Sequence, residues 1–84
     1  MRTLIIDCSG FSLDHTGFVV DENLQVQERV QLTTSDIAAY ASQANGVKKI
    51  KLSGPTEYCL GIKEEISKQL ALEYAINDIE IEVF

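Results

Sequence analysis

The side chains best suited to chemistry lie near the start of the chain: Asp7, Asp14 and His15. A histidine titrates near neutral pH, and a neighbouring carboxylate can orient its ring, so this group could act as an acid–base pair or hold a metal ion. A single histidine beside a polar loop is more commonly a surface residue in a turn. We therefore expect His15 at the surface, and we predict no metal site.

The two cysteines, Cys8 and Cys59, have no CxxC spacing and no metal-binding spacing to a histidine. Cys8 could act as a nucleophile if a base approached it, and His15 is the one histidine available. Nothing in the sequence fixes that geometry. We expect both thiols to be reduced and partly buried.

Composition narrows the class of protein. The chain has 84 residues, 13 acidic and 7 basic, and a net charge of −6, which repels nucleic-acid phosphates. An apolar content of 45% and this length predict one folded domain over residues 1–84. With no signal-peptide layout and no run of 18 apolar residues, we expect a cytoplasmic protein that makes no contact with membranes.

Apolar periodicity divides the chain into strands and helices that could position these residues. Strands are predicted at 3–8, 17–21, 25–32, 47–52 and 79–83, and a polar loop at 9–16. The first helix begins at Thr34 or Ser35 and stops at Asn45-Gly46. The second follows Pro55 and ends at Asn77 or Asp78.

The same periodicity predicts which side chains are buried. The expected core positions are Val26, Val30 and Leu32 in the third strand, Ile37, Tyr40, Ala41 and Ala44 in the first helix, and Cys59, Ile62, Ile66, Leu70 and Tyr74 in the second. Gly61 costs about 1 kcal/mol inside a helix relative to alanine, so we expect it where the helix packs closely on the sheet.

The element order βββαβαβ predicts a two-layer α/β fold with a mixed sheet in the order 3-2-1-4-5. Both crossovers then move in one direction, and right-handed crossovers place both helices on one face. The other face is predicted to bind a partner through a small apolar strip rimmed by polar groups. Its expected residues are Ile5, Val19, Arg29, Lys49, Lys51, Glu80 and Glu82, with the lysines beside the glutamates.

The opening segments Leu4-Ile5-Ile6-Asp7-Cys8-Ser9 and Thr16-Gly17-Phe18-Val19-Val20-Asp21 resemble the ribonuclease H-like superfamily. The likeness is to Holliday-junction resolvase-like and actin-like ATPase members, in which a strand ending in aspartate leads through a loop of small residues to a Thr-Gly strand. The element order extends this resemblance over nearly the whole chain as topology.

Two activities follow from the resemblance. In resolvase-like nucleases carboxylates hold two divalent ions, and Asp7 matches the first of these ligands. Lys51-Leu52-Ser53-Gly54 stands where a second carboxylate belongs, so an enzyme of this class would have to bind Mg²⁺ through Asp7 with Asp14 and an acidic residue of the second helix, such as Glu57. In actin-like ATPases the first loop grips phosphate. Here Ser9, Gly10 and Ser12 would do so, in a homodimer because such enzymes bind nucleotide between two domains.

The missing carboxylates and the absent second lobe favour a different hypothesis. We predict a degenerate ribonuclease H-like domain that needs no cofactor, performs no catalysis and acts as a regulatory or assembly module. Its partner is another protein or a second copy of itself.

Overall fold

In the part of the chain that the structure describes, five strands and two helices form in the predicted order. A computed structural model describes residues 2–10, 14–43 and 46–83, so the predictions for Ser12 and Ala44 fall outside the described residues. The elements are β1 (Arg2–Asp7), β2 (Asp14–Val20), β3 (Val26–Thr33), α1 (Thr34–Gln43), β4 (Val47–Ser53), α2 (Thr56–Glu73) and β5 (Glu80–Val83).

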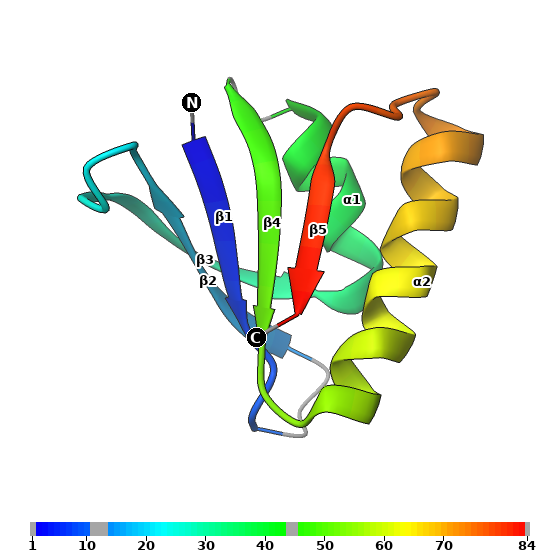
Figure 1. Cartoon of the computed structure of the whole chain (residues 1–84), viewed down its shortest axis with the longest axis horizontal. Helices are drawn as coiled ribbons and strands as arrows, with labels where there is room; N and C mark the ends of the chain where they lie inside the picture. Colours follow the sequence, from blue (N-terminus) through cyan, green and yellow to red (C-terminus); the bar gives the residue numbers. More distant parts are fainter. Residues whose placement is uncertain (1, 11–13, 44–45, 84) are drawn as a thin grey trace.

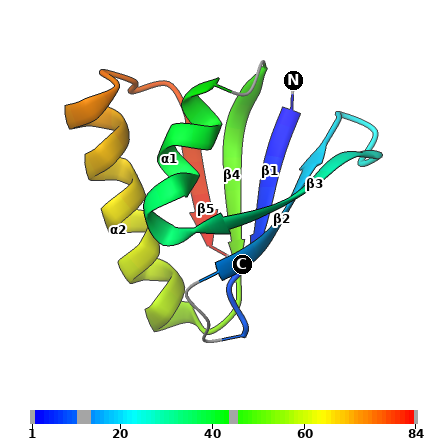
Figure 2. The same cartoon turned by 180° about the vertical axis from the view of Figure 1, so that it is seen from behind.

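The sheet has the predicted order β3-β2-β1-β4-β5. The first three strands form an antiparallel meander, and β4 and β5 are parallel to β1 and β4 respectively. Helix α1 lies behind β5 in Figure 1 and in front of it in Figure 2, where the molecule is turned by 180°, and buried residues of both helices pack against the same side of the sheet. The helices therefore cover one face of the sheet, as the crossover argument predicts.

One apolar cluster fills the space between the sheet and the helices. Alternate residues of the central strands enter it, Leu4 and Ile6 from β1 and Ile50 and Leu52 from β4, all with no exposed surface. The helices contribute every third or fourth residue: Ile37, Ala38 and Ala41 from α1, and Cys59, Ile62, Ile66 and Leu70 from α2. Most predicted core positions are confirmed by this cluster.

Helix α2 ends earlier than the sequence suggests. Tyr74 caps it, Ala75 adopts a positive φ of 53°, and the Ile76 N–H donates a hydrogen bond to the Leu70 carbonyl at 2.8 Å. This left-handed turn satisfies a terminal carbonyl and stops the helix. The prediction that Tyr74 is a core residue is wrong because it lies past the last turn and is exposed.

The β2–β3 hairpin also departs from the prediction. β2 begins at Asp14, and the pairing shifts between Val19, which lies opposite Glu28, and Val20, which lies opposite Val26. This β-bulge moves Val26 off the helix-covered face. The hairpin tip extends away from the helices (Figure 1), and Val26 is 61% exposed instead of buried.

Gly61 is exposed, and a Cβ built on it meets no atom within 4 Å, so the expected close packing is wrong. A Gly61→Ala variant should be more stable by about 1 kcal/mol because alanine loses less backbone entropy in a helix. For a domain of this size the melting temperature should rise by about 4–8 °C. A fall in the melting temperature, measured by circular dichroism, would show that a glycine is required here.

Candidate functional site

No helix of the described residues lies over one face of the sheet, and we call this the open face; Figure 1 looks onto it. Its side chains form cross-strand rows because facing residues of paired strands point to the same side. The central row crosses all five strands and consists, from β3 to β5, of Arg29, Phe18, Ile5, Lys51 and Glu82.

The middle of the open face is apolar. Ile5 and Phe18 are cross-strand neighbours and are half-buried although no helix covers them. Val20 lies next along β2 on the same face, opposite Thr3, but is only 4% exposed. The Arg29 guanidinium carbon lies 5.9 Å from the centre of the Phe18 ring, within cation–π range. An apolar centre with a polar rim is the usual composition of a protein-binding surface.

The flank on β4 and β5 is a ladder of opposite charges, as predicted. The Lys49 ammonium lies 3.2 Å from a Glu82 carboxylate oxygen and 3.9 Å from one of Glu80, and the Lys51 ammonium lies 4.0 Å from Glu82. Each partly exposed pair contributes less than about 1 kcal/mol to stability. The main effect of the ladder is to fix a pattern of charge on the open face.

Six of the seven residues predicted for this face lie on it, but the seventh, Val19, does not. Val19 is opposite Leu4 on the helix-covered side and is only 2% exposed. The error is a register error of one residue, since Ile5 pairs with Phe18 and successive strand residues alternate between faces. Phe18 and Val20 therefore belong to the open face, and the alternation of β2 is the only sequence signal that could have included them.

The aspartate at the end of β1 is engaged by its own loop. The Ser9 N–H and the Ser9 hydroxyl both donate to the same Asp7 oxygen, at 3.0 Å and 2.6 Å. A phosphate placed here would compete with a carboxylate for these donors. Gly10 follows in an exposed turn.

The two hydrogen bonds from Ser9, first the hydroxyl and then the N–H, hold the pKa of Asp7 below its usual range. A depressed folded-state pKa stabilises the protein above about pH 4, and this stability is lost as the pH falls through the folded pKa. We expect Asp7→Asn to destabilise the chain at pH 5 and to have a smaller effect at about pH 2.5. Urea unfolding at both pH values measures this, and parallel pH profiles of the two proteins would contradict it.

The carboxylates of the nuclease hypothesis are not brought together as a metal centre. Asp14 begins β2, and Glu57 is exposed in the first turn of α2. Over the described ranges, no three His, Cys, Asp or Glu side chains are placed to hold a metal ion, and Asp7, Asp14 and Glu57 are within those ranges.

His15 and Cys8 face the helices. His15 is 2% exposed, not a surface residue, and its Nε2 forms a 3.0 Å hydrogen bond with the Thr34 hydroxyl beside the Tyr58 ring. Cys8 is fully buried, and burial, aided by Cys59, raises the pKa of its thiol to about 12. Because the thiolate is the nucleophile, Cys8 is inert at neutral pH.

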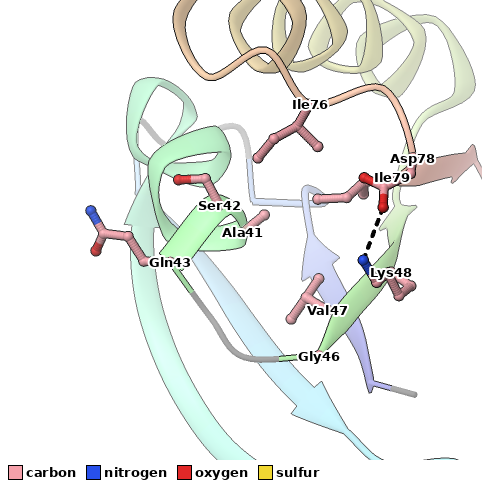
Figure 3. A pocket seen from close by; sticks show the side chains of 9 residues that line it. All are labelled: Ala41, Ser42, Gln43, Gly46, Val47, Lys48, Ile76, Asp78 and Ile79. Carbon is pink, nitrogen blue, oxygen red and sulfur yellow. Dashed lines mark hydrogen bonds and ion pairs between the residues drawn. The ribbon is translucent and has the colours of Figure 1, made fainter.

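A surface hollow of about 310 Å³ lies between the end of α1, the start of β4 and the segment before β5 (Figure 3). The Lys48 ammonium and an Asp78 carboxylate oxygen meet at 2.9 Å at its rim, and the ion pair lowers the pKa of Asp78. The Ser42 hydroxyl donates to the Ala39 carbonyl at 2.7 Å. Lys48 and Asp78 thus pair with each other and Ser42 with the main chain, so these three polar groups already have partners within the chain.

Together these observations define a two-layer α/β protein whose most extensive candidate site is the open face. Comparison with protein-family models, curated proteins and solved structures finds no match to this chain. Neither of the two helices in the described part of the chain is long and apolar enough to cross a membrane.

Proposed function

We propose that this chain is a non-catalytic protein-interaction module, of a regulatory or assembly kind, that binds through its open face. The observation that carries the proposal is the pair of half-buried apolar side chains, Ile5 and Phe18, in the middle of a sheet face over which no helix of the described residues lies. Aliphatic and aromatic groups in such a position gain free energy when a partner excludes water from them.

The groups that could perform chemistry support a non-catalytic role. Asp7 is occupied by Ser9, Cys8 is buried as a neutral thiol, and His15 is held by Thr34 on the helix-covered side. The βββαβαβ order with strands 3-2-1-4-5 supports a degenerate ribonuclease H-like origin. Two free buried cysteines are in keeping with a cytoplasmic location.

Photo-crosslinking tests the proposal because it captures a partner whose identity is unknown. A benzophenone amino acid in place of Phe18 should capture a protein in the cells that encode this chain. The same residue in place of Leu72, an exposed residue of α2, is the matched control. Adducts at position 18 alone support the proposal, whereas adducts only at position 72, or none at 18, would refute it.

The two enzyme hypotheses make a contrasting prediction. A nuclease of the resolvase-like class would be stabilised by Mg²⁺, and an actin-like homodimer by ATP, since ligands that bind only the native state raise its stability. Under the proposed function, millimolar concentrations of either should leave the melting temperature and the light-scattering mass unchanged. A rise with Mg²⁺ that is lost in Asp7→Asn would favour the nuclease.

A further inference from the structure

We infer that the open face binds a second copy of this chain, face to face, about a two-fold axis that runs along β1. This inference rests on the proposed function and names its partner. In this arrangement the strands of the two sheets stay nearly aligned, apart from the rotation of about 30° that sheet twist imposes on stacked sheets.

The order of side chains in the central row carries the inference. A two-fold axis along β1 exchanges the two sides of the row and leaves its centre in place. Ile5 then meets Ile5 of the second copy, and Phe18 faces Lys51. At the edges, Arg29 on β3 faces Glu82 on β5. The row is thus complementary to itself. One apolar contact, between the two Ile5 side chains, lies on the axis. Two aromatic–cation contacts and two cation–carboxylate contacts lie symmetrically on either side of it.

The charges also select this arrangement over the other face-to-face dimer. A two-fold axis across the strands would place each side chain of the row on its own copy. Arg29 would meet Arg29, Lys51 would meet Lys51, and Glu82 would meet Glu82. Juxtaposed like charges suppress association. The axis along β1 brings one charged residue, Asp7 at the exposed end of the strand, onto its own copy, whereas the axis across the strands does so for three residues of the central row. The axis along β1 is therefore the more favourable of the two.

The side chains are already placed for these contacts. The Arg29 guanidinium lies over the Phe18 ring, on the open face and not beyond the edge of the sheet. The Glu82 side chain is 39% exposed, and its carboxylate retains acceptor capacity beside Lys49 and Lys51. The molecule measures 28 × 27 × 19 Å, and its broad side is of the size that standard interfaces use, about 800 Å² per partner.

Charge reversal tests the contact, because Arg29 and Glu82 lie on opposite edge strands and cannot pair within one chain. Sedimentation velocity at 0.15 M salt, where repulsion between chains of net charge −6 is screened, should show a dimer. Arg29→Glu and Glu82→Arg should each weaken dimerisation about tenfold or more. The double variant should dimerise again, since the reversed charges pair across the interface.

Two controls keep the test decisive. Lys63→Glu, at an exposed position on α2, changes the net charge as Arg29→Glu does and should leave the dimer intact. Glu82→Arg places a third cation beside Lys49 and Lys51, so its melting is checked. If it unfolds, Glu82→Gln replaces it, and the double variant with Arg29→Glu should then dimerise more tightly than Arg29→Glu alone.

The outcomes separate this inference from the proposed function. A dissociation constant weaker than about 1 mM, or a dimer in which the double variant shows no recovery, overturns the inference. If position 18 then crosslinks to another protein, the open face still binds a foreign partner. A dimer that is insensitive to every open-face change, with no adduct at position 18, overturns both proposals.

Discussion

A Gly54→Ala variant should lose about 3 kcal/mol of stability and melt more than about 10 °C below the wild type. Gly54 has a φ of 147°, a conformation that side-chain-bearing residues rarely adopt. A Cβ at this position would lie 3.0 Å from the Cys8 carbonyl carbon and 3.2 Å from the Ser9 nitrogen. These are main-chain atoms at the end of β1, so they cannot move aside as a flexible side chain would.

The matched control for this prediction is Gly61→Ala, which makes the same chemical change in open space. The two variants should shift the melting temperature in opposite directions. Equal effects at both positions would contradict the close approach of the Gly54 loop to β1.

Adjacent isoleucines of β1 give the second large effect. Ile6→Ala should cost about 3 kcal/mol because it leaves a cavity in the core, where Ile6 is fully buried. Ile5→Ala removes the same atoms from the open face and should cost about 1 kcal/mol or less. Urea denaturation of both variants measures the difference, and similar losses would mean that the open face is as well packed as the core.

The Ile5→Ala variant also connects stability with function. On the dimer axis, Ile5 would contact its own copy. Ile5→Ala should therefore reduce the free energy of dimerisation more than it reduces the free energy of unfolding. For Ile6→Ala we expect the reverse, a larger loss of folding stability than of self-association, since the Ile6 side chain points to the helices.

Once the strand order 3-2-1-4-5 is taken as the expectation, two local rules are enough to predict the two faces of the sheet. Strict alternation identifies the faces of β4 and β5, and right-handed crossovers place α1 and α2 together. The ladder of Lys49 and Lys51 beside Glu80 and Glu82 follows from the same alternation. None of these steps depends on how distant segments are aligned.

Register and irregularity explain most of what the sequence does not predict. Pattern alone places Val19 on the wrong face because the pairing of β1 with β2 depends on the path of the loop between them. It misplaces Val26 because the bulge opposite Val19 and Val20 breaks the alternation of β3. It makes His15 a turn residue, whereas β2 begins before the Thr-Gly pair and includes this histidine.

Gly17, the glycine of that Thr-Gly pair, is required by packing, which the sequence pattern does not reveal. A Cβ on Gly17 would come within 3.1 Å of both the Ile6 and the Val30 side chains. Glycine here leaves room for the branched side chains of the two neighbouring strands. The motif that resembles a ribonuclease H-like opening thus has a local structural cause in this chain.

The close approach of Gly54 to Cys8 also affects where this fold can bind a ligand. In open α/β sheets, ligands generally bind in a crevice outside the carboxyl ends of the strands. Here Gly54, in the loop after β4, lies against Cys8 and Ser9, which directly follow β1, and the Cys8 N–H donates to the Ser53 carbonyl at 2.7 Å. The protein's own main chain thus lies where such folds commonly bind small molecules. Under the proposed function, a partner would instead be bound across the open face of the sheet.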